Sequence, residues 1–109
     1  MKSISVTELA ALLMSNPTSE DLPLVLDVRE PWEVSCAQLL PSLHIPMGEI
    51  TSRFEEIDAT RSIVCLCHHG VRSLQVARFL QSRGFTDVFN LSGGINAWSI
   101  EVDSRVPIY

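Results

Sequence analysis

Short, almost wholly apolar runs constrain the fold of this chain more than any other feature of its sequence. Two such runs occupy residues 22–28 and 62–66, and each leads into a segment rich in charged or turn-forming residues. A strand without alternation of apolar and polar side chains is buried on both faces, as strands inside a parallel sheet are. These two runs therefore predict the centre of a parallel sheet.

Helical patterns lie between and around the apolar runs. Ser5 and Glu8 have the spacing of a capping box, which predicts a helix that runs to about Ser15. Pro31 suits the first turn of a short helix that reaches residue 34 or 36, because the amide hydrogen that proline lacks is left unpaired in that turn anyway. Residues 49–57 carry a weaker amphipathic pattern.

The clearest helix begins soon after the second apolar run. Four apolar residues repeat at helical spacing on one of its faces: Val71, Leu74, Ala77 and Leu80. Gly84 supplies a left-handed end for this helix. Brief strands are expected at residues 43–45 and 88–89, and residues 91–98 turn into a last helix.

This alternation of strands and helices predicts one α/β domain over residues 1–109. With 109 residues and 46% apolar side chains, the chain is long enough to form one core. We expect a three-layer sandwich in which helices flank a mainly parallel central sheet. The loops after the carboxyl ends of such strands gather at one edge, where ligands usually bind, and here they hold Asp27, Cys67 and Gly93.

Net charge and the lengths of the apolar runs argue against several classes of partner. The chain has 13 acidic and 8 basic residues and a net charge of −5, which opposes binding to the phosphates of nucleic acid. No apolar run approaches the roughly 20 residues that span a bilayer, and the first residues make a poor secretory signal. We therefore expect a cytoplasmic protein with no nucleic-acid and no membrane partner.

Three cysteines fit a reducing compartment better than a disulfide framework. Their number is odd, and Cys65 and Cys67 lie only two residues apart, so we expect free thiols. Cys65 lies two residues before Cys67, so its side chain should point to the same face of the sheet, deeper in the core. We expect it to pack in the core and to have no chemical role. Cys36 belongs to the short helix, and we prefer a structural role for it unless its side chain is exposed.

The segment CHHGVRS at residues 67–73 joins the second apolar run directly to a helix. A thiol at the mouth of such a turn meets backbone amides that can point inward, and these lower a cysteine pKa from about 8.5 to roughly 3.5–7.5. Cys67 is then a nucleophile at neutral pH, although a small buried apolar residue is the other interpretation. Gly70, which permits unusual backbone angles, and the cation of Arg72 favour the nucleophile.

Four separated motifs together resemble the rhodanese family. They are LDVREP at residues 26–31, HIP at residues 44–46, CHHGVRS at residues 67–73 and LSGGINAW at residues 91–98. The resemblance covers nearly all of the chain and implies the rhodanese-like sandwich. It also implies that Cys67 takes the outer sulfur of a donor such as thiosulfate, becomes a persulfide and passes the sulfur to cyanide or a thiol.

The resemblance implies further roles in the loop after the cysteine. The residues that would bind the substrate are His68, His69, Gly70, Val71, Arg72 and Ser73. Backbone amides would carry most of this stabilisation. The chemistry requires no cofactor and no metal. Its partners would be small sulfur donors and thiol or cyanide acceptors, with a sulfur-accepting protein as a further candidate.

Two other classes of function stay open. Phosphatases and arsenate reductases resemble this family but place five residues between the cysteine and the arginine, whereas four separate Cys67 from Arg72. A sulfur carrier or protein-binding module without turnover would use the same persulfide. Kinetics with thiosulfate and cyanide distinguish an enzyme from such a carrier.

Asp27 and Arg29 stand in the first of the four motifs and could brace the loop by a charge-assisted hydrogen bond or ion pair. We expect Asp27 to cap the short helix after it and Arg29 to share in holding the substrate. His68 and His69 could ligate a metal, but side chains adjacent to Cys67 are poorly placed to close one tetrahedral shell. We expect their imidazoles to shape the entrance and to tune its charge near neutral pH.

Overall fold

Five parallel strands form one sheet in the computed structural model, which describes residues 2–15, 22–39 and 41–109. The strands are β1 (Lys2–Ile4), β2 (Leu24–Asp27), β3 (Leu43–His44), β4 (Ile63–Leu66) and β5 (Val88–Leu91). Their order in the sheet is β1-β5-β4-β2-β3, and every pair of neighbours is parallel. β2 and β4 thus lie inside the sheet, as their apolar runs predict.

Helices connect these strands. They are α1 (Val6–Ser15), α2 (Pro31–Cys36), α3 (Ile50–Arg53), α4 (Val71–Ser82) and α5 (Gly94–Glu101). Two short 3₁₀ turns, η1 (Met47–Glu49) and η2 (Phe54–Glu56), flank α3. None of the helices in the described parts of the chain is both long and apolar enough to span a bilayer.

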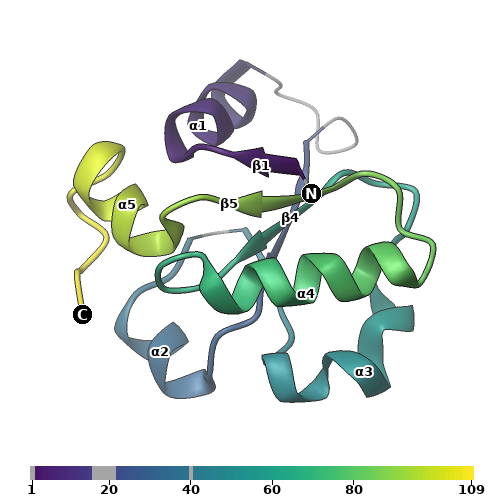
Figure 1. Ribbon diagram of the computed structural model, residues 1–109. Helices are drawn as coiled ribbons and strands as arrows, with labels where there is room; N and C mark the ends of the chain where they lie inside the picture. Colours follow the sequence, from purple (N-terminus) through teal and green to yellow (C-terminus); the bar gives the residue numbers. More distant parts are fainter. Residues whose placement is uncertain (1, 16–21, 40) are drawn as a thin grey trace.

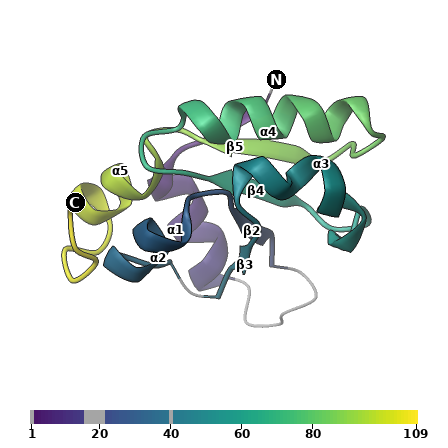
Figure 2. The same ribbon diagram turned by 90° about the horizontal axis from the view of Figure 1, so that it is seen from below.

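Helices cover both faces of the sheet, and the sheet separates the hydrophobic core into two clusters. On one face, α3 and α4 pack against the sheet through a cluster that includes Ile50, Cys65 and Val76. On the other face, α1 and α5 pack through a cluster that includes Leu9 and Trp98. Figures 1 and 2 show α4 and α1 on opposite sides of the sheet, which confirms the predicted three-layer α/β sandwich.

Local signals in the sequence place several helix ends correctly. The backbone N–H of Ser5 donates to the Glu8 carboxylate at 3.0 Å, and the N–H of Glu8 donates to the Ser5 hydroxyl at 3.1 Å. This is the predicted capping box at the start of α1. α2 begins at Pro31, as predicted, and Gly84 follows α4 with a φ of +94°.

Four features differ from the sequence-based expectations. No local pattern predicts a strand at β1, because Lys2 and Ser3 interrupt the apolar residues and pairing with β5 is what orders this segment. The helix predicted at residues 49–57 is broken into α3 and two 3₁₀ turns, which still bring its apolar side chains onto the core. Val71, predicted on the buried face, is the first residue of α4 and is 69% exposed. Cys36, the last residue of α2, is also exposed, so the structural role preferred for this thiol is not supported.

The start of α5 packs against the loop that follows β4. The backbone N–H of Ile95 donates to the carbonyl oxygen of Cys67 at 3.0 Å. The N–H of Asn96 donates to the carbonyl oxygen of His68 at 3.1 Å. Gly94 allows this approach, because a Cβ there would lie 2.5 Å from the His68 oxygen and its φ of +59° favours glycine. Figure 1 shows this loop at the left end of α4, beside α5.

Replacement of Gly94 with alanine should destabilise the fold. The added Cβ would overlap the backbone of residues 67–68 and would sit at a left-handed φ, so we expect a loss of about 2–4 kcal/mol. Gly48→Ala is the matched control, since a Cβ there would meet no atom of the described residues within 4 Å. Urea denaturation compares the two variants. Equal stabilities would contradict the tight packing of α5 on the loop.

Candidate active site

Cys67 stands where β4 ends and the loop to α4 begins. Its sulfur accepts a hydrogen bond from the backbone N–H of Gly70 at 3.0 Å and lies 3.3 Å from the hydroxyl oxygen of Ser73. Gly70 has a φ of +105° and directly precedes α4, so the chain turns sharply around the sulfur. The Cys67 side chain is only 1% exposed, and it is turned toward these neighbouring donors.

The hydrogen bonds to α5 set the direction of the amides in this loop. In a trans peptide, the C=O group and the following N–H group point in opposite directions. Because the carbonyl of His68 points to α5, the N–H of His69 points away from α5, and it stabilises the Cys67 sulfur. Backbone amides therefore surround the sulfur as an anion site requires.

Burial and hydrogen bonding act in opposite directions on the Cys67 thiol. Burial raises its pKa, whereas the Ser73 hydroxyl and the backbone N–H groups of residues 69, 70 and 73 lower it. The hydrogen bonds outweigh burial, so the pKa of Cys67 lies below the ordinary value of a cysteine. Cys65 belongs to the same core cluster, but burial, followed by the charge of Cys67, raises its pKa to about 12. The surroundings thus favour ionisation of Cys67 and not of Cys65.

Arg72, expected as a cation beside the thiol, binds a carboxylate. Its two terminal nitrogens donate to Glu33 of α2 at 2.5 and 2.8 Å. These hydrogen bonds lower the pKa of Glu33 to about 2 in spite of its burial. The guanidinium still attracts the Cys67 thiolate electrostatically. Arg72 therefore acts on Cys67 from a distance while it ties α4 to α2.

Asp27 and Arg29 form a buried ion pair. Arg29 donates from Nε and Nη2 to the two carboxylate oxygens of Asp27 at 2.9 and 2.7 Å. The expectation that Asp27 caps the helix after it is wrong, because Glu30 and Glu33 form the capping box of α2 and the buried guanidinium takes both Asp27 oxygens. The remaining Arg29 donors bind two backbone carbonyls and the Tyr109 hydroxyl rather than facing the loop.

The imidazole of His68 lies between two other rings. It stacks on Tyr109 with 4.0 Å between ring centroids and 7° between planes, and on His69 with 4.0 Å and 29°. Burial, followed by the charge of His69, lowers the pKa of His68, so this ring is neutral near pH 7. His69 is exposed. Within the described ranges, no three His, Cys, Asp or Glu side chains gather as metal ligands.

Tyr109 joins the two ion pairs near the loop. Its hydroxyl donates to Glu33 Oε2 at 2.8 Å and accepts from Arg29 Nη1 at 3.0 Å. A continuous chain of polar contacts thus runs from Asp27 at the end of β2 to Arg72 at the start of α4. We refer to it as the arginine network.

Sequence reasoning missed three residues around this site: Glu33, Asn90 and Tyr109. Asn90 of β5 accepts from the Ser73 hydroxyl at 2.5 Å and donates to the Gly70 carbonyl at 3.0 Å. A polar residue inside an apolar strand needs a buried partner, and this signal could have identified Asn90. The spacing of Glu33 from Glu30 indicates only a helix cap, and no local pattern marks Tyr109.

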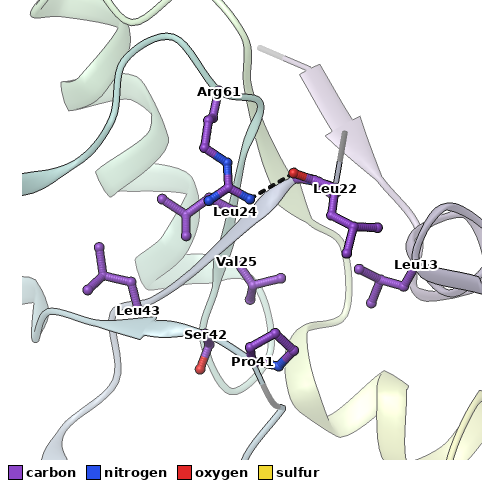
Figure 3. Close-up of a pocket in the computed structure, with 9 residues that line it drawn as sticks. Leu13, Leu22, Leu24, Val25, Pro41, Ser42, Leu43 and Arg61 are labelled. Atoms are coloured by element: carbon purple, nitrogen blue, oxygen red, sulfur yellow. Dashed lines mark hydrogen bonds between the residues drawn. The ribbon is translucent and has the colours of Figure 1, made fainter. Parts of the chain in front are cut away.

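A cavity of about 470 Å³ lies at the amino ends of the strands, whereas Cys67 lies at their carboxyl ends. Its walls include Leu24 and Leu43, at the starts of β2 and β3, and Arg61, which precedes β4 (Figure 3). Arg61 donates there to the backbone oxygen of Leu22. Ligands of parallel sheets usually bind outside the carboxyl ends of the strands. We therefore place the candidate site at the Cys67 loop and not in this cavity.

Comparison with known proteins agrees with this fold. The family model of the rhodanese-like domain matches residues 5–101. The chain belongs to the rhodanese-like family. The rhodanese-like domain protein from Staphylococcus aureus, whose crystal structure is known, is 28% identical with a TM-score of 0.83. That match covers 100% of this chain and 99% of the other, and it confirms the resemblance drawn from the four motifs.

Curated relatives carry the rhodanese-like domain in proteins of different length. A protein of Allochromatium vinosum named Sulfurtransferase is 38% identical over 74% of this chain and 75% of its own length. Rhodanese-like/PpiC domain-containing protein 12, chloroplastic, of Arabidopsis thaliana is also 38% identical. That match covers 100% of this chain but only 38% of the plant protein. The identity to the relative named Sulfurtransferase supports sulfur transfer as the general class of activity.

Protonation of Glu33 should weaken the fold in acid. Its pKa is about 2 in the folded chain against an ordinary value of 4.5, so the ion pair with Arg72 contributes fully above pH 4.5 and is lost as the pH falls toward 2. We expect Glu33→Gln to cost about 2 kcal/mol at neutral pH and progressively less in acid. Urea denaturation at several pH values measures this cost. Glu55→Gln, which removes an exposed carboxylate, is the control. A cost that does not change with pH would contradict the assignment.

Proposed function

We propose that this rhodanese-like protein is a sulfurtransferase that carries sulfane sulfur on Cys67. The Cys67 thiolate attacks the outer sulfur of a donor such as thiosulfate. A new S–S bond forms as the S–S bond of the donor breaks, and sulfite leaves with the electron pair. A thiolate or cyanide then attacks the outer sulfur of the persulfide and releases the Cys67 thiolate. Both steps exchange one anion for another, so neither needs a proton from the protein.

The observation that carries this proposal is the set of hydrogen bonds to the Cys67 sulfur. The N–H of Gly70 donates to it, and the combined effect of the surrounding donors is a lowered pKa in a buried position. The thiolate and the persulfide are both anions, and fixed amides stabilise both without reorganisation during the reaction. A buried cysteine with a purely structural role would have a raised pKa, as Cys65 has.

We assign substrate-binding roles to the residues of the loop: His68, His69, Gly70, Val71, Arg72 and Ser73. The support differs among them. The backbone N–H groups of Gly70, Ser73 and His69 act on the sulfur, and exposed Val71 lies in the loop at the start of α4. Asp27 and Arg29 have a supporting role, because Arg29 holds Tyr109 and Tyr109 packs on His68.

Two observations favour sulfur transfer over phosphoryl transfer. Four residues separate Cys67 from Arg72, one fewer than in the related phosphatases. A phosphatase also needs an acid to protonate the leaving group. The carboxylates of Asp27 and Glu33 are both bound by arginines, so neither is free to serve as that acid. Sulfite and thiolates leave without such help.

Incubation with thiosulfate should add one sulfur atom to the protein, at Cys67. Trypsin cleavage after Arg61 and Arg72 places Cys65 and Cys67 in one peptide and Cys36 in another, and fragment ions separate the first two. Cys67→Ser should abolish loading because it removes the nucleophile. Cys65→Ala, the matched control, should load as the unaltered protein does. Sulfur found on Cys65 would overturn the assignment.

Repeated turnover should distinguish an enzyme from a carrier. With thiosulfate and cyanide in excess, we expect many thiocyanate ions per protein molecule, and a loss of on the order of 10³-fold or more in Cys67→Ser. Colorimetric assay of thiocyanate measures both. One thiocyanate per loaded protein and no more would indicate a carrier. Hydrolysis of an aryl phosphate that depends on Cys67 would indicate a phosphatase instead.

A further inference from the structure

Asn90 of β5 contacts the candidate active site with both atoms of its side-chain amide. It is 6% exposed. The Ser73 hydroxyl donates to Asn90 Oδ1 at 2.5 Å, and Asn90 Nδ2 donates to the Gly70 carbonyl oxygen at 3.0 Å. The same Ser73 oxygen lies 3.3 Å from the sulfur of Cys67. The single hydrogen of the Ser73 hydroxyl thus has two possible acceptors, Asn90 Oδ1 and the Cys67 sulfur.

The chemistry of the groups fixes how this amide is oriented. The carbonyl oxygen of Gly70 can only accept a hydrogen bond, so the nitrogen of Asn90 has to face it. The amide oxygen then faces Ser73 and can also only accept. Ser73 has a single hydroxyl hydrogen, and it is directed to Asn90.

With its hydrogen directed to Asn90, Ser73 presents only lone pairs to Cys67. A protonated Cys67 can donate its S–H to the Ser73 oxygen, whereas an ionised sulfur has nothing to donate. The thiolate gains a hydrogen bond from Ser73 only when the hydroxyl turns from Asn90 to the sulfur. That rotation leaves the buried oxygen of Asn90 without its donor, which is costly.

We propose that Asn90 is a positioning residue that acts through Ser73: it holds the hydroxyl hydrogen away from the sulfur, so Cys67 loses its proton less readily than it would beside a hydroxyl that is free to donate. Ionisation of Cys67 is then coupled to rotation of the Ser73 hydroxyl. A resting thiol is less prone to oxidation than a thiolate, which suits a site that waits for its sulfur donor. The benefit of a protonated resting cysteine rests on the proposed function, but the protonation of Cys67 can be measured without any sulfur transfer.

Several ionisable groups surround Cys67 and stay unchanged in the test. They are Cys65 on β4, His68 and His69 in the loop, Arg72 on α4 with its partner Glu33 on α2, and the Asp27–Arg29 pair at the end of β2. β5 and the first turn of α5 carry no charged side chain. A shift in the titration of Cys67 between variants of residues 73 and 90 therefore reports the hydroxyl and the amide.

Substitutions of the two residues should move the titration of Cys67 in opposite directions. Asn90→Leu frees the Ser73 hydrogen for the sulfur, so the midpoint of the pH–rate profile for alkylation should fall by roughly one pH unit. Ser73→Ala removes the only hydroxyl that can turn to the thiolate, so the midpoint should rise. Iodoacetamide labelling, read at the tryptic peptide of residues 62–72, measures each profile.

The double variant separates this effect from a distorted loop. If Asn90 acts through Ser73, Asn90→Leu should leave the midpoint unchanged in a Ser73→Ala background. If Asn90 merely braces the Gly70 carbonyl, the same substitution should shift the midpoint equally in both backgrounds. Equal shifts, or a rise in the single Asn90→Leu variant, would overturn the proposal. Neither result depends on whether the protein transfers sulfur, so the proposed function can fail separately.

A measurement on the unaltered chain keeps the proposal testable if Asn90→Leu does not fold. With asparagine labelled by ¹³C at the side-chain carbonyl, the Asn90 signal should shift as the pH crosses the Cys67 midpoint, because its oxygen loses the Ser73 hydrogen. In Cys67→Ala the signal should not titrate. An Asn90 signal that stays constant while Cys67 ionises would overturn the proposal.

Discussion

The direction of three backbone carbonyls determines most of what the Cys67 loop can do. Those of Cys67 and His68 are bound by the first amides of α5, and that of Gly70 is bound by Asn90 of β5. Because the His68 carbonyl is held by α5, the N–H of His69 faces the sulfur, together with the N–H of Gly70 that donates to it. The anion site is therefore a property of three packed elements. The seven residues of the loop would not adopt it alone.

The arginine network fixes the surroundings of this loop in a similar way. A buried charge is stable only with its partners in place, so each member constrains the position of the next. Asp27, Arg29, Tyr109, Glu33 and Arg72 thereby hold β2, α2, α4 and the segment after α5 at set distances. Arg72 consequently serves the loop as an anchor between two helices as much as through its charge.

Sequence patterns predicted the layers of the fold and the position of the cysteine, because apolar periodicity reports burial and the CHHGVRS motif is local. β2, β4 and α4 were found in this way, whereas β1 depends on a partner strand far along the chain. Glu33 and Asn90 escaped notice for the same reason: their partners lie 39 and 17 residues away. The cap predicted for Asp27 is wrong because local spacing indicates where a helix begins but does not show that Asp27 and Arg29 are buried together as an ion pair.

The strand order has a consequence for how the protein is made. β1 at the start of the chain pairs with β5 near its end, with Lys2 opposite Phe89, and α5 follows later still. The residues from β1 through α5 therefore all have to emerge from the ribosome before Asn90 and α5 can dock. Until then the cysteine behaves as an ordinary thiol in a flexible polypeptide. The arrangement of amides around its sulfur requires β5 and α5 to be in place, because these elements bind the carbonyls of the loop.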